Sequence, residues 1–579
     1  MALIHMTKQA HLADFQRVMQ AKVVAIALKT AQPEPANPWR SPMRWIQVAT
    51  REDIFIIDAG SVDCRDAMVP LLEDPNILKV FHHAKFAARH FLQRWNAAPR
   101  PLFCTYHAGQ LLAMGRRGFQ HRLRDLAERF LQSSPEPTWE LLWERDEIDE
   151  DLIQAAADEA ELLLDLHQAM NAAIATHKLK RVTSLEFRTV VPVAAMELRG
   201  IFVDRERLKP LTTSLQAELD ALETEVKQHL RDPESLFEDE SFLNLHSPKQ
   251  LLPALQRAGV EVRDTSEHQL RPYLDKHPWL KSLLAYRHRS IVLNTLHQLE
   301  QAIAPETGRV HATYHQIASP SGRFACSDPN IQQVPREAEV RSCIRPEPGY
   351  RYVMADYSQV ELRVAAGLSQ APVMMEAYRN GEDLHRLTAA LTMGKQPDQV
   401  TSSERQAAKA INFGLIYAMG AAGLQASAKN SYGVALSMEE ATTFRDRFFQ
   451  NYHGIARWQQ RLGEEGRRRG YVRTAGGRLR SYQGEKMRIT EMLNTPVQGT
   501  AAEGLKSALC IFWDKVKAAE LDAAIVAIIH DEIIVEVRED QAERAKEVLV
   551  ASMTEGIAWL VPGVPFVADA ALASSWAEK

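Results

Sequence analysis

The sequence has few cysteines, and no two of them are close together in the chain. Its five cysteines are scattered along the chain, and no two form a Cys-x-x-Cys pair: Cys64, Cys104, Cys326, Cys343 and Cys510. This spacing argues against a disulfide framework and against a cysteine-based zinc site. We therefore expect a protein that works in a reducing compartment.

Long apolar runs are also missing. No uninterrupted apolar stretch approaches the ~20 residues that cross a bilayer, and residues 1–8 lack the apolar core of a signal peptide. Internal repeats and low-complexity tracts are absent as well. These absences predict a soluble, intracellular protein without membrane contacts.

The chain has no excess of positive charge. It contains 69 Lys and Arg against 74 Asp and Glu, which gives a net charge of -5. A polyanionic ligand would therefore need a basic cleft set into an acidic exterior. With 579 residues and 45% hydrophobic content, the chain can bury the cores of three or four domains.

One segment combines cations and aromatic rings at helical spacing. Thr401 and Glu404 have the spacing of a capping box, which predicts that a helix begins there. The residues that follow at intervals of four predict a single stripe on that helix: Arg405, Lys409, Phe413 and Tyr417. Such a stripe suits a polyphosphate at one end and a stacked base at the other. An amphipathic core helix with solvated charges is the alternative, and the segment alone favours it.

Two acidic motifs flank this helix in the sequence. Residues 352–363 read as a strand that runs into a helix, with Asp356 at the end of the strand. Ser358 and Glu361 again have capping-box spacing, so Glu361 also has a purely structural interpretation. Residues 525–537 read as a hairpin whose polar tip carries Asp531 and Glu532. Alone, such a tip more often marks only a turn.

Together the three segments indicate one chemistry. Carboxylates from separate strands can hold two divalent ions ~3.5–4 Å apart, which clamp the attacking and leaving oxygens of a phosphoryl transfer. A cationic helix can then neutralise the charge that develops on a departing pyrophosphate. The combination predicts a two-metal phosphoryl-transfer enzyme.

The three motifs, residues 356–363, 405–417 and 530–532, resemble those of family A DNA polymerases, the bacterial DNA polymerase one type and its phage relatives. The resemblance covers essentially everything after residue 184. It implies a template-directed enzyme that adds deoxynucleotides to a primer 3′ end during replication or repair. The implied partners are primer-template DNA and deoxynucleoside triphosphates. The protein is expected to act as a monomer in the cytoplasm of a bacterium or a phage-infected host.

The resemblance also implies roles for individual residues. Asp356 and Asp531, helped by the Tyr357 carbonyl, would bind two Mg²⁺ ions, which Mn²⁺ could replace, with Glu532 in support. Lys409 would also protonate the leaving pyrophosphate. The nucleotide-binding set is Arg405, Lys409, Phe413, Tyr417, Glu361, Gln359 and His385. Within this set Glu361 would form the floor under the sugar, and His385 has a helix-core or capping role as its alternative.

A DNA-binding set follows from further family-like segments: Arg323, Asn330, Gln332, Asn494, Gln498, His530 and Arg478. Its amides suit the nearly sequence-independent acceptors of the minor groove. The run from Arg467 to Arg473, with Arg478 and Arg480, is a candidate phosphate-tracking stretch, and a solvated helix end is the alternative. Thr490 departs from the family, because relatives often place an arginine four residues before the Asn494 position. Arg488 lies two residues away from that place.

The implied fold is a multidomain α/β and α+β protein: a ribonuclease H-like exonuclease domain followed by a right-hand polymerase. We expect the exonuclease-like domain at 1–180 and the thumb at 181–300. The palm would take 301–365 and 481–579, and the fingers 366–480. The start of the chain at the exonuclease-like domain leaves no room for the 5′-nuclease domain that some relatives carry.

The metal-binding motifs of the exonuclease-like domain are degenerate. Where the family has Asp-x-Glu, this sequence has Ala27 and Lys29, and where its second motif ends in an acid, it has Ala87. Only Asp158 of the third motif remains, with a predicted role as a solvated or capping helix residue. One carboxylate cannot hold two metals, and a lysine repels them, so we expect no proofreading.

Two other functions remain as alternatives. Single-subunit RNA polymerases share the paired aspartates and the helix lysine, but the floor at Glu361 would exclude a 2′-hydroxyl. A DNA-binding scaffold without catalysis is disfavoured by the intact Asp356, Asp531, Arg405 and Lys409. Accessory replication proteins are not indicated by the sequence.

Overall fold

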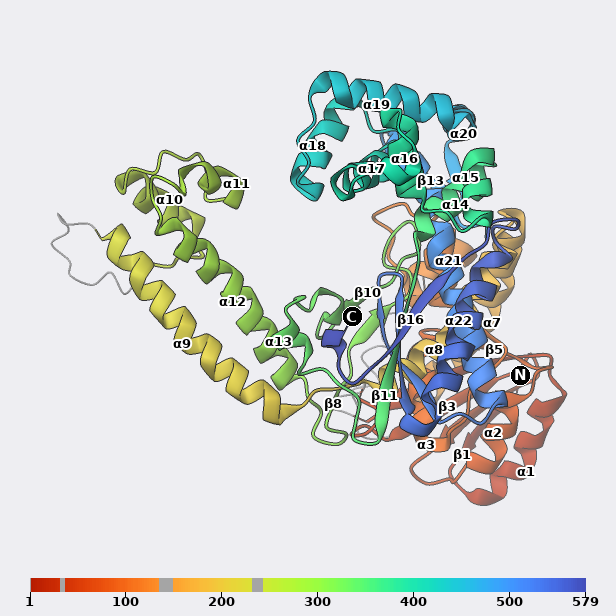
Figure 1. The fold of residues 1–579 in the computed structure, drawn as a ribbon. Helices are drawn as coiled ribbons and strands as arrows, with labels where there is room; N and C mark the ends of the chain where they lie inside the picture. Colours follow the sequence, from red (N-terminus) through yellow and green to blue (C-terminus); the bar gives the residue numbers. More distant parts are fainter. Residues whose placement is uncertain (1, 32–36, 135–148, 232–242, 579) are drawn as a thin grey trace. The chain divides into compact units, whose positions relative to one another are not determined.

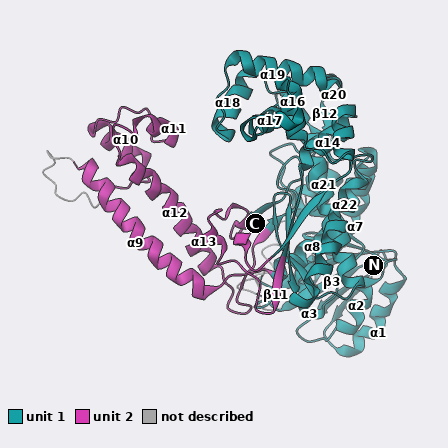
Figure 2. Cartoon of the chain, viewed as in Figure 1, with its two compact units in different colours: residues 1–199, 314–326, 353–572 teal, residues 200–313, 327–352, 573–579 magenta. Residues whose placement is uncertain are grey.

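The computed structural model describes residues 2–31, 37–134, 149–231 and 243–578. They form two compact units (Figure 2). Unit 1 comprises residues 1–199, 314–326 and 353–572, and unit 2 comprises residues 200–313, 327–352 and 573–579. No helix among the described residues is long and apolar enough to cross a membrane. By these residue ranges, unit 1 contains the predicted exonuclease-like region together with most of the predicted palm and fingers. The limits of the exonuclease-like domain, palm, fingers and thumb stay a prediction.

A six-stranded sheet forms the N-terminal part of unit 1, in the order β1-β4-β3-β2-β5-β6. Its strands are β1 (Ala2–Met6), β2 (Val23–Thr30), β3 (Met43–Ala49), β4 (Asp53–Asp58), β5 (Leu78–Phe81) and β6 (Leu102–Cys104). β3 runs antiparallel to both β2 and β4, and the other neighbours are parallel.

Helices pack around this sheet (Figure 1): α1 (Leu12–Phe15), α2 (Arg65–Glu73), α3 (Ala84–Trp95), α4 (Thr105–Leu112), α5 (Leu123–Leu131) and α7 (Glu150–Thr176). The next helix, α8 (Lys180–Arg199), is buried over most of its length and packs against α3 and α21 (Ile489–Ala518). One apolar core runs from Met6 through Ala194 and includes Leu479. The N-terminal sheet and the later segments of unit 1 therefore share a core through α8.

A four-stranded sheet carries the acidic motifs, in the order β14-β15-β11-β16. Its strands are β11 (Tyr350–Tyr357), β14 (Ala523–Ile529), β15 (Glu532–Arg538) and β16 (Ala568–Ala573). β14 and β15 form the predicted hairpin, with Ile529 paired to Glu532 across a two-residue turn. His530 in that turn has a φ of 57°, the left-handed conformation that such tight turns require. Helices α14 (Val360–Ser369), α21 and α22 (Ala542–Ala558) belong to the same part of the unit (Figure 1).

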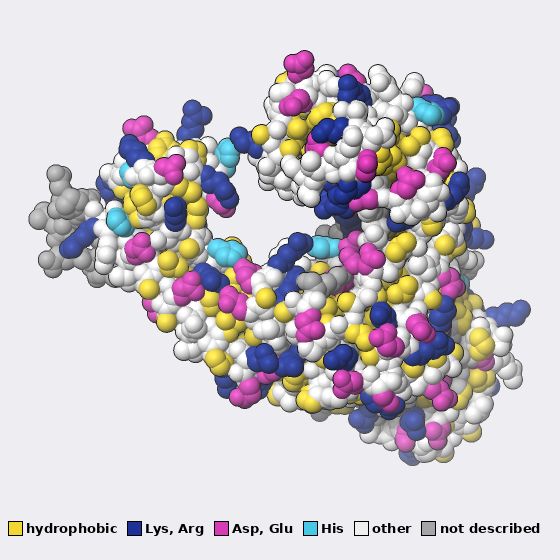
Figure 3. Space-filling model, viewed as in Figure 1, with side chains coloured by type: hydrophobic (Ala, Val, Ile, Leu, Met, Phe, Trp, Pro, Cys, Tyr) yellow, Lys and Arg dark blue, Asp and Glu magenta, His cyan; other side chains and the backbone are white. Residues whose placement is uncertain are grey.

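A helical region follows α14: α15 (Pro372–Arg379), α16 (Leu384–Met393), α17 (Ser402–Leu415), α18 (Ala421–Tyr432), α19 (Met438–Asn451) and α20 (His453–Arg469). Two short strands, β12 (Tyr471–Arg473) and β13 (Leu479–Ser481), form a hairpin after it. The predicted capping box at the start of α17 is confirmed, because the Thr401 and Glu404 side chains each accept the other residue's N–H. On the face shown in Figure 3, a dense group of Lys and Arg side chains lies at the lower edge of the lobe that carries α17 and α18.

The expectation that α17 continues to Tyr417 is wrong. The helix ends at Leu415, and Ala418 takes a left-handed φ of 57°. The Met419 N–H then bonds back to the Gly414 carbonyl, which closes a Schellman-type end. Tyr417 therefore projects from the terminating turn and not from the helical stripe.

Unit 2 is mainly helical: α9 (Arg205–Leu230), α10 (Pro248–Arg257), α11 (Glu267–Leu270), α12 (Leu280–Gln301) and α13 (Ala338–Arg341). α9 and α12 pack along each other. β7 (Ile201–Phe202) pairs with β8 (Arg309–Val310), and the short strands β9 (Thr313–His315) and β10 (Ala325–Ser327) pair with each other. The Asp204 side chain caps the start of α9 by accepting from the N–H groups of Glu206 and Arg207.

Candidate active site

Two aspartates approach each other in the four-stranded sheet. Asp356 lies near the end of β11, and Asp531 lies in the turn between β14 and β15, next to β11 in the strand order. Burial raises the pKa of Asp531, and the negative charges of Asp356 and Glu361 raise it further. Negative charge is therefore concentrated where the two motifs meet. A divalent cation would relieve this repulsion.

The donor set fits a hard cation that also takes oxygens from a substrate. Among the described residues, no group of three or more His, Cys, Asp and Glu side chains is arranged to hold a metal. Mg²⁺ characteristically uses one or two carboxylates and completes its shell with water and substrate phosphates. Asp356 and Asp531 supply those two carboxylates, and Glu532 begins β15 directly beside them. The Tyr357 side chain is buried and donates to the Met553 carbonyl (2.7 Å).

Glu361 joins two other predicted residues. Its carboxylate accepts a hydrogen bond from the Arg323 guanidinium at 2.5 Å and another from the Tyr417 hydroxyl. Burial raises the pKa of Tyr417, and the Glu361 charge adds to this effect, so the hydroxyl stays protonated and donates. Gln498 also hydrogen-bonds the Tyr417 side chain. Arg323 and Tyr417, which are far apart in the sequence, thus meet at the Glu361 carboxylate, and Gln498 joins them through Tyr417.

The capping-box interpretation of Glu361 is wrong. α14 begins at Val360, its N-cap is Gln359 with a left-handed φ of 54°, and no side chain caps it. Glu361 is in the first turn, but its carboxylate is used by Arg323 and Tyr417. The Gln359 side chain accepts from the Tyr378 hydroxyl at 3.2 Å, which fixes it against α15.

The cationic helix is anchored to α16 by an ion pair. Arg405 Nε lies 2.5 Å from Asp383 Oδ2, and Asp383 also caps α16 by accepting from the N–H groups of His385 and Arg386. Burial alone would raise the pKa of Asp383, but the hydrogen bonds from Arg405 and from the backbone outweigh it and lower the pKa. The ion pair therefore orients Arg405 before any ligand is present.

His385 is buried in the first turn of α16. Its pKa is lowered to about 4, mainly by burial and also by the charges of Arg405 and Lys409, while Asp383 opposes the shift. The ring is neutral at pH 7, and its Nδ1 hydrogen-bonds the Asn412 side chain at 2.9 Å. Its ring centroid lies 6.0 Å from that of Phe413. The surroundings of His385 thus match the alternative prediction of a residue in a helix core. Its Nδ1 is used by Asn412, which leaves Nε2 for a ligand.

Lys409 lies one turn after Arg405 on α17 and is partly exposed. No carboxylate among the described residues pairs with it. An ammonium group without a carboxylate partner, one turn from an anchored guanidinium, is suited to bind an anion that arrives from solution.

The predicted DNA contacts divide between the two units. Asn494 and Gln498 lie on α21 in unit 1, and Arg323 precedes β10 in the same unit. His530 is exposed in the turn of the β14–β15 hairpin. Asn330 and Gln332 belong to unit 2, where the Asn330 side chain accepts from the Gln332 N–H at 3.1 Å.

Arg478 is not available to DNA, and we correct that expectation. Its side chain is only 4% exposed, and its guanidinium contacts Glu186 on α8 and lies 3.5 Å from Glu503 on α21. Lys506 also reaches Glu186, at 2.6 Å. Arg480 is buried too and pairs with Glu485 at 2.6 Å. These arginines neutralise internal carboxylates, because a buried acid needs a partner.

The positions predicted to correspond to exonuclease metal ligands carry no cluster of carboxylates. Lys29 on β2 places its Nζ 3.1 Å from the Glu159 carboxylate, and the Gln47 amide donates to the same carboxylate at 3.3 Å. Ala87 is buried in α3. Asp158 is exposed on α7 and accepts from Gln154 at 2.7 Å, which confirms its prediction as a solvated helix residue.

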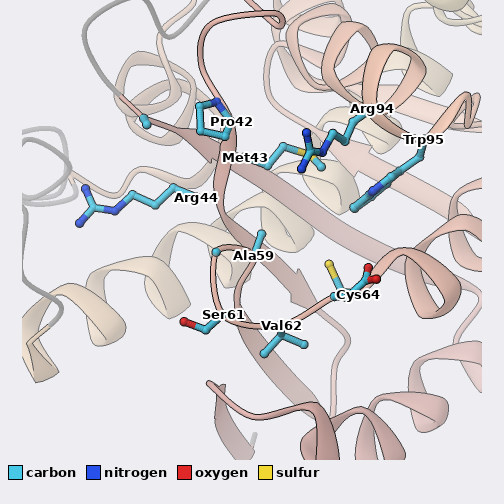
Figure 4. Close-up of a pocket in the computed structure, with 12 residues that line it drawn as sticks. Pro42, Met43, Arg44, Ala59, Ser61, Val62, Cys64, Arg94 and Trp95 are labelled. Carbon is cyan, nitrogen blue, oxygen red and sulfur yellow. The ribbon is translucent and has the colours of Figure 1, made fainter.

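The surroundings of these positions include two histidines that add no negative charge. Burial lowers the pKa values of His82 and His83, and the positive charge of Lys29 lowers them further. A pocket of about 490 Å³ also lies in this region, between Met43, the loop from Ala59 to Cys64, and Trp95 (Figure 4). The lining of that pocket does not include Ala27, Lys29, Ala87 or Asp158.

Three functional side chains were missed by the sequence analysis. Asp383 anchors Arg405, Asn412 holds His385, and Tyr378 holds Gln359. The Asp383-Leu-His385 sequence carried a signal for the cap, since aspartate two residues before a helical N–H is a common N-cap. No nearby residue in the sequence indicated that Asn412 would bond His385 or that Tyr378 would bond Gln359, because these partners are 27 and 19 residues away.

Family models match both parts of the chain. A model described as DNA polymerase family A matches residues 205–578, and a model described as 3′-5′ exonuclease matches residues 4–175. The first match includes both acidic motifs and the cationic helix. The expected order of an exonuclease-like domain followed by a polymerase domain is confirmed.

Bacterial DNA polymerases are similar to this chain over most of its length. A DNA polymerase I of Aquifex aeolicus (strain VF5) is 30% identical over 97% of this chain and 99% of its own length. A DNA polymerase I of Pseudomonas aeruginosa is 33% identical over 88% of this chain, which spans only 58% of that relative. The solved structure of the POL domain of Pol1 from M. smegmatis, in complex with DNA primer-template and dNTP, has a TM-score of 0.84 at 26% identity and 99% coverage of both chains.

Proposed function

This chain belongs to DNA polymerase family A, and we propose that it extends primer 3′ ends on a DNA template by two-metal phosphoryl transfer without proofreading. The observation that carries the proposal is the convergence of Asp356, Asp531 and Glu361, together with an anchored cationic helix in the same unit. The structural neighbour holds primer-template DNA and dNTP, and we infer the same ligand classes for this chain.

The carboxylates of Asp356 and Asp531 would hold two Mg²⁺ ions, with the Tyr357 carbonyl as a further ligand. When bound, the ions would stabilise the negative charge of the attacking and leaving oxygens. The binding role of Asp531 fits its surroundings, because burial and the nearby charges of Asp356 and Glu361 raise its pKa, and a bound cation would offset both effects. Mn²⁺ offers the same ligand preference and should replace Mg²⁺.

Arg405 and Lys409 would bind the triphosphate of the incoming nucleotide. Arg405 is already oriented by Asp383, so it loses little freedom on binding. Lys409 would donate a proton to the pyrophosphate oxygen as the bond to the α-phosphorus breaks. Phe413 and His385 would pack beside the nucleotide, since their rings are neighbours on α17 and α16.

Glu361 and Tyr417 would set the shape of the sugar and template-base site. The carboxylate of Glu361 is held by Arg323 and Tyr417, so it cannot move away from a 2′-hydroxyl without breaking those bonds. This restraint supports deoxynucleotides as substrates and disfavours the RNA polymerase alternative.

The charges at the predicted exonuclease metal positions support the proposed lack of proofreading. The Lys29–Glu159 pair and the neighbouring histidines replace a carboxylate cluster with a site that has no surplus negative charge. Two divalent ions would therefore gain no Coulomb attraction there.

Primer extension tests the whole proposal. The purified protein, a primed DNA template and Mg²⁺ should give template-directed extension with deoxynucleotides and much less with ribonucleotides. Preferential use of ribonucleotides would establish the RNA polymerase alternative. Binding of the primed template without extension in either Mg²⁺ or Mn²⁺ would establish the scaffold alternative.

A further inference from the structure

A groove of about 990 Å³ lies within unit 1 beside the predicted DNA-contacting residues. Three chain segments that are far apart in the sequence line it. The first is the loop between α4 and α5, with Arg116, Arg117 and Phe119. The second is the turn at residues 319–321, and the third runs from Arg480 to Gln498. The exonuclease-like region therefore contributes one wall of a groove whose other walls come from the polymerase region.

The lining of the groove carries a surplus of positive charge. Arg117, Lys486 and Arg488 are exposed, and no carboxylate among the described residues pairs with any of them. Arg480 is neutralised by Glu485. Glu491 is the acid that opposes the three exposed cations in the lining. An anionic ligand would therefore be attracted to this groove.

Phe119 and Arg116 form an aromatic and cationic wall. Phe119 is 37% exposed, which is unusual for a phenylalanine, and two guanidiniums lie over its ring, Arg116 at 4.8 Å and Arg129 at 4.5 Å. Arg116 also donates to Gln483 at 3.3 Å, which ties the loop to the polymerase segment. Exposed aromatic rings and arginines along a basic groove are the combination that binds unpaired nucleotides by stacking and by phosphate contacts.

The groove also contains an unsatisfied polar atom. The Asn494 Oδ1 atom is buried and has no hydrogen-bond partner. Asn494 and Gln498 both line the groove. A buried acceptor without a partner costs free energy, which a ligand donor would recover.

We propose that this groove binds a single-stranded segment of the DNA substrate, with its phosphates on Arg117, Lys486 and Arg488. The inference rests on the proposed function, since it adds a subsite to the polymerase's DNA. Its volume lies in the range of sites for small ligands, ~300–1,000 Å³, and is too small for a duplex. The exonuclease-like region thereby keeps a DNA-binding task after losing its reaction.

Binding experiments without nucleotides test the subsite. We compare three labelled DNAs by fluorescence anisotropy: a blunt duplex, the same duplex with a 5′ template overhang, and the same duplex with an unpaired 3′ primer tail. The test variant is Arg117→Ala with Arg488→Ala, and Arg117→Lys with Arg488→Lys preserves the charge. Lys22→Ala with Arg65→Ala removes two exposed cations that do not line the groove.

The test variant should bind one or both overhang DNAs roughly 2- to 30-fold more weakly at low salt than the wild type. Its log-log salt slope should fall by about 1.4, since each phosphate contact on a single strand contributes about 0.7. Blunt-duplex affinity should stay unchanged, and the Lys variant should keep the wild-type slope. If only the DNA with the 5′ template overhang loses affinity, the groove binds the template strand. If only the DNA with the unpaired 3′ tail loses affinity, it binds the primer strand.

Two outcomes would overturn the subsite. One is equal weakening for blunt and overhang DNAs, which would mean a duplex contact. The other is a test variant that binds like the Lys22→Ala, Arg65→Ala control. These readouts need no catalysis, so a wild-type protein that shows the overhang effect but extends no primer would refute only the proposed function.

Discussion

Removing the Glu361 carboxylate should disturb Tyr417 more than Arg323. The Arg323 side chain is 47% exposed, and an exposed ion pair contributes only ~0–1 kcal/mol. The Tyr417 hydroxyl is more deeply buried, and a hydrogen bond to a charged group is worth ~1.5–3 kcal/mol. The bond between Tyr417 and Glu361 should therefore dominate, and its loss corresponds to a roughly 10- to 150-fold change in an equilibrium or rate ratio.

A double-mutant cycle isolates this contact. We expect Glu361→Ala and Tyr417→Phe each to lower kcat/KM for a deoxynucleotide, and the double variant to lose far less than the product of the two effects. Single-nucleotide insertion with matched deoxy- and ribonucleotides measures both rates. In Glu361→Ala the ratio of ribonucleotide to deoxynucleotide use should rise, because the floor that excludes the 2′-hydroxyl is gone. Glu376→Ala, which removes an exposed acid on α15, is the control.

Two results would refute the reasoning. If the single effects multiply in the double variant, Glu361 and Tyr417 act independently and their hydrogen bond does not organise the site. If the ribonucleotide ratio is the same in Glu361→Ala and Glu376→Ala, then Glu361 does not face the sugar.

Three further predictions concern the metals, the exonuclease-like region and the buried charges. Asp356→Asn should abolish primer extension and leave primer-template affinity largely intact; near-normal turnover would disprove its role. Wild-type protein given mismatched primer ends and Mg²⁺ or Mn²⁺, without nucleotides, should release no mononucleotides above background, and trimming that Asp158→Ala abolishes would show that the motifs are misplaced. Glu186→Gln should destabilise unit 1 by ~3–5 kcal/mol, because Lys506 and Arg478 lose their buried partner. Burial would raise the pKa of Glu186, but the charges of Lys506 and Arg478 outweigh it and hold the pKa at about 2, against 4.5 ordinarily. That stabilisation is present above pH 4.5 and is lost as the pH falls towards 2, so the thermal inactivation midpoints of wild type and variant should converge there.

Local signals in the sequence predicted local structure well. The capping box at Thr401 and Glu404, the β14–β15 hairpin and the strand that ends near Asp356 all depend on residues within a few positions of each other. Their backbone hydrogen bonds and turn conformations are set by those neighbours, so the pattern is sufficient. The family resemblance then supplied the order of the domains.

Long-range partners could not be predicted in the same way. The alternative interpretation of Glu361 as a helix cap arose because Ser358 is near in sequence, whereas its real partners, Arg323 and Tyr417, lie 38 and 56 residues away. Arg478 was predicted to contact DNA because other arginines are near it in the sequence. Its actual partner is the buried carboxylate of Glu186, which is 292 residues away. A charge in the sequence does not reveal whether it will meet solvent, a ligand or an internal carboxylate.

The shared core around α8 limits how this protein can change during evolution. The helix buries residues such as Val182, Val190 and Ala194 in the same core as the N-terminal sheet. A deletion that removed the sheet would leave this apolar face in contact with water, and such a face promotes aggregation. Point substitutions at Ala27 or Ala87 carry no such penalty. Side chains of the N-terminal region can therefore change one at a time, whereas its fold is an obligatory part of the core that it shares with the polymerase region.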